Sequence, residues 1–575
     1  MNVRMDTLTH LSRRFVGASP FPQRVFVGLS LLVGLTLIAA PSDIRAQAGG
    51  AGQGGTNTEY NHDLARRARA VRTQAAIDVD GRLDEAVWTQ APVITDLLQE
   101  DPDEGAPGSE RTEFRIAFDD NAIYIGAMLY DRFPVTGRLA RRDAGQGDFD
   151  YIMISLDSFH DHETVYQFAV NASGSFRDAV SGGGGGGGGR GGGGGGGDIS
   201  WDPVWDQATQ VTEAGWSAEV RIPFSQLRFS PDNEQVWGIQ LRRNIFRNQE
   251  RVAFPFVPTL DRGGASRFAH LEGIENIRSG QKLEFLPYLA ARGEYLQLES
   301  PPGIGFANPY QSGSDYFGEV GLDLKYRLAS NVTLDATVNP DFGQVEVDPS
   351  VINLTAFETR FQERRPFFVE GGDIFRIGEG GPAGSTGQPP QLFYSRRIGR
   401  RPSGRVPSNA VFSDVATATT ILGAAKITGR VGGGWSLGLM EAVTSQEIGT
   451  YMDATQVVDQ AVVEPRTNFL VGRLRRQFSG GLTRLGSFGT AVNRKLGGTD
   501  LGGRLHSAAY SGGVDFAHEW SNRTYRFSTM FTGSYVQGDP EVIARTQQSS
   551  TRYYQRPDAD HLTLDANATS LGGYY

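Results

Sequence analysis

The stretch GEVGLDLKYRLASNVTLDATV, Gly318 to Val338, decides the fold. Its first arm places apolar residues at every second position from Val320 to Leu328, with charged residues between them. After a turn at 329–331 the alternation resumes from Val332 to Val338. Because successive side chains of a strand point to opposite faces, this stretch predicts a β-hairpin with one apolar face and one charged face. Each arm approaches the roughly 9–11 residues that a tilted strand needs to cross a bilayer.

The same pattern returns further along the chain. Residues 504–535 form a second such pair around a turn at 521–523, and residues 421–439 form a third around three glycines at 432–434. A hairpin of a soluble sandwich has the same period. Long amphipathic strands with aromatic residues near their ends are nevertheless typical of a membrane barrel. We therefore expect an antiparallel outer-membrane β-barrel over residues 280–575.

Composition narrows the class of protein. A chain of 575 residues is long enough for more than one domain. It has no Cys, which excludes disulfides and thiolate metal sites. Its net charge of −10 and its pI near 5.5 argue against a nucleic-acid partner. A mean hydropathy of −0.33 argues against membrane-spanning helices. It does not argue against a barrel, because half of the residues in each barrel strand are polar and keep the mean hydropathy low.

The amino terminus has the features of an export signal. Arginines at positions 13, 14 and 24 precede the apolar run Val25–Ala40, and Ala46–Gln47–Ala48 offers small residues at a cleavage site. This arrangement predicts a signal peptide over residues 1–48. The Gly-rich and then Arg-rich residues 49–75 are expected to be a flexible leader.

A first folded domain is expected over residues 76–273. Short segments of strand character follow one another at close spacing and are joined by Asp, Asn and Gly turns: Thr112–Phe118, Ala122–Tyr130, Tyr151–Asp157, Val165–Val170, Trp216–Ile222 and Trp237–Leu241. This pattern predicts an antiparallel β-sandwich. The glycine tract at 182–197 is expected to be a mobile insertion, and its glycine spacing reflects composition and not a nucleotide site.

Several motifs in this domain resemble a known family. They are DGRLDEAVW, TEFRIAFDDNAIYIGAMLYD, FDYIMISLDSF and VWDQATQVTEAGWSAEVRIPFSQLRF. Together they resemble the family 9 carbohydrate-binding module, and more narrowly the version placed before an outer-membrane barrel in a bacterial family of undefined function. The segments VNPDFGQVEVDPSVINLTAFETRFQERRPFFVEGGDIF and LFYSRRIG resemble the second half of that family. The resemblance implies an all-β protein with a carbohydrate-binding sandwich followed by a barrel. It implies no activity.

Saccharide binding requires aromatic platforms and polar side chains that fix hydroxyl groups. Trp201 and Trp205, in WDPVW, are the best platform candidates, although packing in the core is an equally open reading for each. The tryptophans at 88, 216 and 237 lie in apolar patterns and are expected in the core. Side chains that could supply hydrogen bonds are Asn171, Arg242, Arg243 and Asn244, for which ordinary surface roles are the alternative.

Metal binding has weaker support. Carboxylates that could hold calcium are Asp78, Asp80, Asp84, Asp148 and Asp150, but the twelve-residue calcium loop is absent. The resemblance to family 9 modules implies a structural calcium ion. His160 and His162 with Glu163 suit zinc, but no third ligand is evident in the sequence, so we expect a solvated turn there.

Two catalytic motifs are absent from the sequence. It has no H-E-x-x-H and no phosphate-binding loop. A glycoside hydrolase needs just two carboxylates about 5–9.5 Å apart, so a hydrolase, or an accessory module in carbohydrate catabolism, stays an alternative. No catalytic residue is assigned.

The segment 346–375 combines helical apolar spacing with dense charge, which predicts either a plug inside the barrel or a loop over its rim. The sequence thus predicts an outer-membrane protein whose periplasmic sandwich binds an oligosaccharide or polysaccharide and whose barrel anchors or passes the ligand. Expected partners are outer-membrane lipid, the saccharide and the barrel-assembly machinery. A sandwich that braces or gates a pore without binding sugar is a further alternative. Whether the barrel is complete at Tyr575 is left open.

Overall fold

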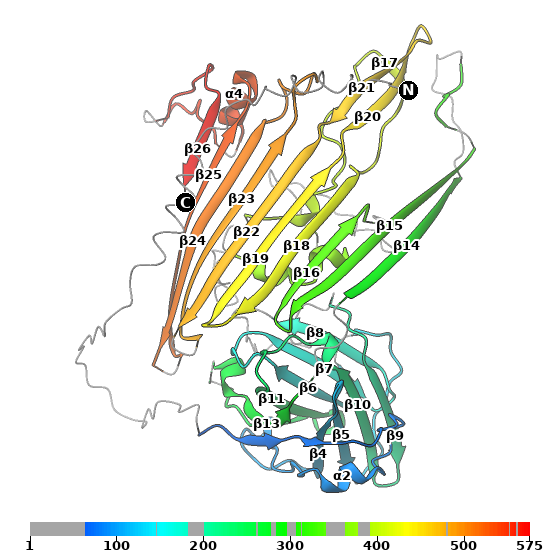
Figure 1. Cartoon of the computed structure of the whole chain (residues 1–575), viewed down its shortest axis with the longest axis vertical. Helices are drawn as coiled ribbons and strands as arrows, with labels where there is room; N and C mark the ends of the chain where they lie inside the picture. The colour runs from blue at the N-terminus through cyan, green and yellow to red at the C-terminus, as the bar shows by residue number, and fades with distance from the viewer. Residues whose placement is uncertain are drawn as a thin grey trace, which may run out of the picture. The chain divides into compact units, whose positions relative to one another are not determined.

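The computed structural model describes residues 64–574 apart from 145–146, 182–200, 260, 262, 278–282, 296–305, 312, 341–360, 362, 378–391, 479–480, 522, 551 and 559–561 (Figure 1). The expected signal peptide, the first part of the leader and the glycine tract lie outside these residues. All described residues fall in one of the two units of the chain, Glu59–Tyr575. They are mostly β-structure, as the alternating sequence pattern predicts.

The amino-terminal domain is a sandwich of two sheets (Figure 1). The first has eight strands, in the order β1-β13-β11-β6-β7-β8, with β12 paired to β11 and β3 paired to β12. The second has five strands, in the order β2-β4-β5-β10-β9. The strands are β1 (Arg67–Arg69), β2 (Val71–Arg72), β3 (Leu98–Asp101), β4 (Thr112–Phe118), β5 (Ala122–Tyr130), β6 (Tyr151–Asp157), β7 (Val165–Asn171), β8 (Phe176–Ser181), β9 (Asp206–Thr212), β10 (Gly215–Pro223), β11 (Glu234–Ile245), β12 (Glu250–Phe254) and β13 (Ala269–Glu275).

The core of the sandwich consists of the apolar side chains that the two sheets direct toward each other. Trp216 of β10 and Trp237 of β11 are fully buried in it, as their apolar surroundings in the sequence predict. Trp88, on the short helix α2 (Ala86–Gln90), is also buried but packs in a smaller cluster with Tyr124. Because side chains of this size contribute most of the apolar area removed from water, they stabilise the domain strongly.

The folded part of the chain begins earlier than the sequence predicts. Residues 67–72 belong to the segment expected to be a flexible leader, yet they form β1 and β2. β1 pairs in parallel with β13, and β2 pairs in parallel with β4. The sequence does not predict these two strands, because strands of two or three residues are stabilised by neighbours that are distant in sequence. The local pattern of arginine and small residues is therefore not typical of a strand.

The carboxyl-terminal half forms one antiparallel sheet of ten strands, ordered β14-β15-β16-β18-β19-β22-β23-β24-β25-β26 (Figure 1). Its members are β14 (Leu283–Tyr295), β15 (Ser314–Ala329), β16 (Val332–Val338), β18 (Ile421–Val431), β19 (Trp435–Thr444), β22 (Thr467–Phe478), β23 (Thr483–Arg494), β24 (Ala508–Trp520), β25 (Tyr525–Gln537) and β26 (Ser570–Tyr574). The three predicted hairpins are present as β15–β16, β18–β19 and β24–β25. Within the described residues β14 and β26 do not pair, so closure into a barrel stays a prediction.

The two faces of this sheet differ sharply in chemistry. One carries apolar side chains that are exposed, among them Val320, Leu439 and Phe531 at 67%, 45% and 59% exposure. The opposite face carries buried polar and charged side chains, such as Asp335, Lys426 and Arg473. A water-soluble sheet normally buries its apolar face and exposes its polar face. In this sheet the apolar face is exposed and the polar face is buried.

Part of the segment 346–375 is described and packs on the polar face of the sheet. It contains α3 (Pro366–Val369) and the 3₁₀ turn η5 (Gly372–Phe375). Phe367, Phe368 and Phe375 form an apolar cluster with Met440 and Phe488 of the sheet. Lys426 of β18 donates hydrogen bonds to the carbonyl oxygens of Phe367 and Glu370. The sheet therefore orients the residues that follow α3.

The other elements are short. A three-stranded sheet contains β17 (Ala410–Asp414), β20 (Glu447–Asp453) and β21 (Val458–Glu464), and α4 (Pro540–Gln548) follows β25. Further 3₁₀ turns are η2 (Phe224–Gln226), η3 (Phe246–Asn248), η4 (Gly264–Arg267) and η6 (Ser395–Arg397). In the part of the chain that the structure describes, no helix has the length and apolar character needed to cross a membrane.

Candidate functional site

A cavity is lined by residues of both the sandwich and the ten-stranded sheet, and we call it the junction pocket. The space among its lining residues, including space that is open to solvent, amounts to about 700 Å³. The sandwich contributes residues of β7, β8, η2 and the loop before β9, and the sheet contributes residues of β15, β16 and β18. The α3–η5 segment completes the lining. The polar and aromatic lining residues are Phe159, Thr164, Tyr166, Trp201, Ser225, Gln226, Arg228, Lys325, Arg327, Thr333, Glu370 and Arg430.

Trp201 forms an aromatic wall of the junction pocket. Its ring is partly buried, with its centroid 5.0 Å from that of Tyr166 and 5.7 Å from that of Phe168. These contacts fix the indole from behind, while the side chain still lines the cavity. A fixed aromatic ring at a cavity wall suits the apolar C–H face of a sugar ring.

Trp205, the second predicted platform, is a core residue. It packs edge-on against Phe168 and Phe176, and its indole N–H donates a 3.0 Å hydrogen bond to Oδ1 of Asp178. Burial raises the pKa of the Asp178 carboxyl, although Trp205 and Arg142 lower it by hydrogen bonding. The sequence WDPVW therefore provides one pocket residue and one core residue.

Charged side chains from the sheet and from the sandwich meet at the pocket. Lys325 of β15 lies 2.5 Å from Oε1 of Glu370, and Arg228 lies 3.9 Å from the same oxygen. Arg430 of β18 pairs with Asp161 and donates a 2.5 Å hydrogen bond to Oγ1 of Thr164. Among the described lining residues, four are cationic and one is a carboxylate. Cations thus outnumber carboxylates among these lining residues.

Arg327 differs from the other cations of the pocket. Its side chain is 7% exposed, and its Nη2 donates a 2.7 Å hydrogen bond to the carbonyl oxygen of Ser225. Within the described residues its Nη1 has no hydrogen-bond partner, and no carboxylate forms an ion pair with it. Because buried guanidinium groups are normally paired, this one is notable. Neither Arg327 nor Arg430 stands out in the sequence, where each reads as an ordinary charge on an amphipathic strand.

Beside the pocket, Glu163 binds three arginines of the sheet, and we call these four residues the Glu163 cluster. Its carboxylate lies 2.5 Å from Arg475, 3.2 Å from Arg484 and 3.8 Å from Arg430. Burial raises the pKa of Glu163, but the three arginines together hold that pKa below its ordinary value. The expected solvated turn at residues 160–163 is therefore wrong for Glu163, whose side chain is buried against arginines more than 260 positions away in the chain.

The imidazole rings of His160, His162 and His270 pack against one another. The centroid of His160 lies 4.9 Å from that of His162 and 4.8 Å from that of His270. Burial, with the charge of His162, lowers the pKa of His160 to about 4, so the His160 ring is neutral near pH 7. No group of three or more His, Asp or Glu side chains within the described ranges is arranged to hold a metal ion.

The predicted calcium ligands serve other roles. Asp148 pairs with Arg138 at an exposed position, and Asp80 caps the backbone N–H of Arg82. Both oxygens of the buried Asp150 accept backbone N–H groups, from Thr136 and Phe246 at 2.7 Å each. Asp78 and Asp84 lie near the start of α2, where the backbone N–H of Asp78 donates to Glu85. The calcium site stays a prediction.

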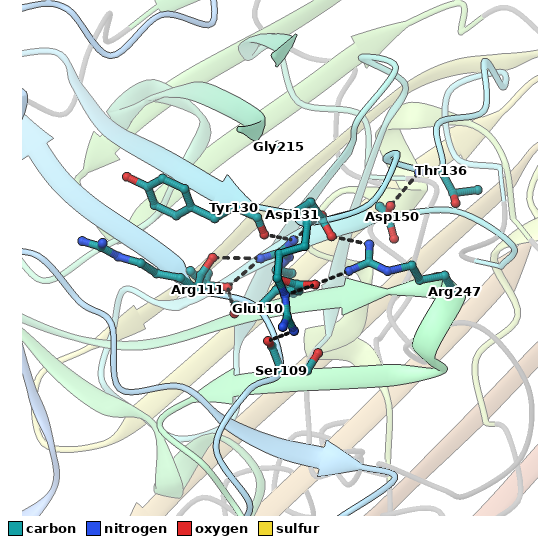
Figure 2. Close-up of polar contacts among 12 residues, drawn as sticks. Ser109, Glu110, Arg111, Tyr130, Asp131, Thr136, Asp150, Gly215 and Arg247 are labelled. Carbon is teal, nitrogen blue, oxygen red and sulfur yellow. Dashed lines mark hydrogen bonds and ion pairs between the residues drawn. The ribbon is translucent and has the colours of Figure 1, made fainter. Parts of the chain in front are cut away.

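The predicted hydrogen-bonding residues are not brought together. The side chain of Arg243 is fully buried and pairs with Asp131 at 2.6 Å. Arg247 pairs with both Asp131 and Glu110 (Figure 2). We call these four residues the Arg243 network. Arg242 pairs with Glu100, and Asn244 donates to the carbonyl oxygen of Phe149. Asn171 caps the turn to β8 by accepting the N–H groups of Ser173 and Ser175. None of these residues lines the junction pocket, so their contacts are structural.

Comparison with known proteins finds one matching family model and several similar solved structures. The model of a domain of unknown function (DUF5916) matches residues 282–555. A family 9 carbohydrate-binding module from Caldicellulosiruptor kristjanssonii in complex with glucose is 18% identical, with 36% of this chain and 95% of that chain covered and a TM-score of 0.26. The module from the same organism in complex with cellotriose is 20% identical, with coverage of 36% and 93% and a TM-score of 0.25.

A putative carbohydrate-binding protein from Bacteroides uniformis ATCC 8492 is 11% identical, with coverage of 36% and 98% and a TM-score of 0.28. No curated protein matches the chain. The expected resemblance to family 9 modules and to a family of undefined function thus has counterparts among known proteins, at low identity. Glucose and cellotriose are ligands of the Caldicellulosiruptor modules.

Proposed function

We propose that the chain is an outer-membrane protein that captures a saccharide in the junction pocket, between its sandwich and the polar face of its ten-stranded sheet. The observation that carries the binding half is the setting of Trp201. Its ring lines a cavity that polar groups also line, among them Gln226, Thr333 and Lys325. An apolar ring face together with hydrogen-bonding groups is the combination that saccharides require.

The membrane half of the proposal is supported by the faces of the sheet. Exposed apolar side chains recur along successive strands, from Val320 on β15 to Phe531 on β25. In water an apolar surface of this extent would promote aggregation, whereas in a membrane the lipid chains would cover it. Strands of β22–β25 have 12 or 13 residues, which is sufficient for a tilted strand to cross a bilayer. In this proposal the α3–η5 segment is part of a plug.

Capture without covalent chemistry fits the pocket better than hydrolysis does. A glycoside hydrolase needs two carboxyl groups on either side of the scissile bond. Among the described residues that line the pocket there is one, Glu370, and it is bound to Lys325. The described lining of the pocket therefore does not contain the pair of carboxyl groups that the hydrolase alternative requires.

A second candidate function is that the sandwich braces or gates the sheet and binds no sugar. The Glu163 cluster favours this alternative, because it joins the loop before β7 to β18, β22 and β23 through buried ion pairs. The two functions make different predictions for Trp201. If the sandwich is a brace, Trp201 contributes packing alone, and its replacement should change stability without changing the affinity for any saccharide.

The test is calorimetric titration of the purified full chain in detergent with a panel of neutral and acidic oligosaccharides. We expect binding of at least one class, and about a tenfold or greater loss for Trp201→Leu, which keeps apolar volume but removes the ring. Trp520→Leu, on the exposed face of the sheet, is the matched control and should leave the affinity unchanged. Failure of the folded chain to bind any member of the panel would overturn the proposal and leave the bracing role.

A further inference from the structure

We infer that the saccharide held in the junction pocket is acidic, and that Arg327 receives its carboxylate. This inference rests on the proposed function, because it names the class of ligand for the same pocket. It depends on the balance of charge around the cavity, on the burial of Arg327 and on the geometry of a guanidinium group.

Cations outnumber carboxylates among the described residues that line the pocket. Lys325 and Arg228 share Glu370, and Arg430 is matched by Asp161 and Glu163. Arg327 forms no ion pair with a described carboxylate, although Glu284 and Glu370 act on it electrostatically from beyond ion-pair distance. In a partly closed cavity such a charge is screened less than on an open surface, and it attracts an anion.

Arg327 is the cation best placed to take that anion. It is more than nine-tenths buried, it lines the cavity, and Nη1 has no acceptor among the described residues. A buried charge without a directly paired carboxylate costs free energy, and a ligand carboxylate would reduce that cost. Because guanidinium is planar and presents parallel N–H groups, it matches a carboxylate better than it matches a hydroxyl.

Trp201 restricts the class of anion further. A small inorganic anion has no apolar face and would leave the indole unused. A uronic acid residue combines an apolar ring face for Trp201 with a carboxylate for Arg327, and both side chains line the same cavity. The chemistry of the lining therefore fits an oligosaccharide that contains uronic acid residues.

The experiment compares uronate oligosaccharides of several linkages with their carboxyl-reduced counterparts, which are neutral and otherwise alike, on the full chain in detergent. We expect the acidic forms to bind about tenfold or more tightly at low salt, with the preference shrinking as salt rises. Arg327→Gln should abolish the preference by weakening the acidic forms alone. Arg327→Lys should keep part of it, because the charge remains but the planar fork is lost.

Arg138→Gln is the matched control, since it removes an exposed arginine of the sandwich that does not line the pocket. It should leave both affinities unchanged. Equal or tighter binding of the reduced forms, with a loss of affinity in Trp201→Leu, would overturn the inference and leave the proposed function standing. Binding of neither form would overturn both. An equal loss for both forms in Arg327→Gln would also refute the role of Arg327. The comparison on the unaltered chain decides the ligand class even where a variant fails to fold.

Discussion

Nη2 of Arg475 lies 2.5 Å from Oε2 of Glu163, although the two residues are 312 positions apart in the chain. Arg475 belongs to β22 of the ten-stranded sheet, and Glu163 belongs to the loop that leads into β7 of the sandwich. Both side chains are largely removed from solvent. This buried pair is therefore a direct contact between the two halves of the chain.

Glu163→Gln should destabilise the protein by about 3 kcal/mol, because it leaves the guanidinium groups of Arg475 and Arg484 buried with less compensating charge. The measurement is equilibrium urea unfolding of the full chain in detergent. Asp148→Asn, which removes an exposed ion pair with Arg138, should cause no measurable change. A Glu163→Gln variant as stable as the parent would mean that this contact contributes nothing to folding.

The Arg243 network should matter for stability and not for ligand binding. Arg243→Met leaves Asp131 buried with Arg247 alone, and we expect a loss of about 3–5 kcal/mol. Saccharide affinity of the remaining folded protein should be unchanged, because Arg243 does not line the junction pocket. Calorimetry on material checked by circular dichroism tests this. A selective loss of affinity would restore Arg243 as a binding residue.

Trp205→Phe should destabilise the sandwich by about 1–3 kcal/mol while saccharide affinity is retained. The substitution keeps an aromatic ring in the core but removes the indole N–H that binds Asp178. Thermal unfolding and titration on the same preparation separate the two effects. The contrast with Trp201→Leu is informative, because that variant should show the opposite result: weaker binding with a smaller effect on unfolding.

Glu219 should make stability depend on pH. Burial raises the pKa of its carboxyl to about 7, against the hydrogen bonds donated by Gly81 and Trp88. A carboxyl whose folded pKa is raised is protonated in the native state while the unfolded chain already ionises. The contribution of Glu219 to the free energy of unfolding is therefore greatest below pH 4.5, and it falls as the pH rises toward and through about 7.

Glu219→Gln should remove that dependence. Relative to the parent, the variant should gain on the order of 1–3 kcal/mol between pH 5 and pH 8. Urea unfolding at both pH values provides the measurement. An unchanged difference between variant and parent at the two pH values would show that Glu219 titrates at its ordinary pKa.

The exposed apolar face should not tolerate charge if it lies in lipid. Leu439→Arg should reduce insertion into bilayers by about 2–4 kcal/mol, and less protein should appear in the heat-modifiable folded form. Val211→Arg is the matched control: it changes another exposed apolar residue, on β9 of the sandwich, which is expected to face water. Equal tolerance of both substitutions would contradict a membrane location.

Much of the fold was predictable because alternation is a local property. The period of two from Val320 to Leu328 defines both the strand and its faces, whatever lies beside it. The outcome for Trp201 and Trp205 was not predictable, since both occur in one five-residue stretch and differ in which neighbours they meet. Arg327 and Arg430 were missed for the same reason. A signal that could have found them is their place on the polar face, each near the end of a strand that borders a turn.

The carboxyl end of the short helix α3 is capped by a lysine of another element, β18. Lys426 donates to the carbonyl oxygens of Phe367 and Glu370, which a helix of four residues leaves without intrahelical donors. The same ammonium group lies 3.6 Å from Asp335 on the neighbouring strand. Under a pulling force the segment would lose these contacts together, so it should leave the sheet in one abrupt step rather than by gradual unravelling.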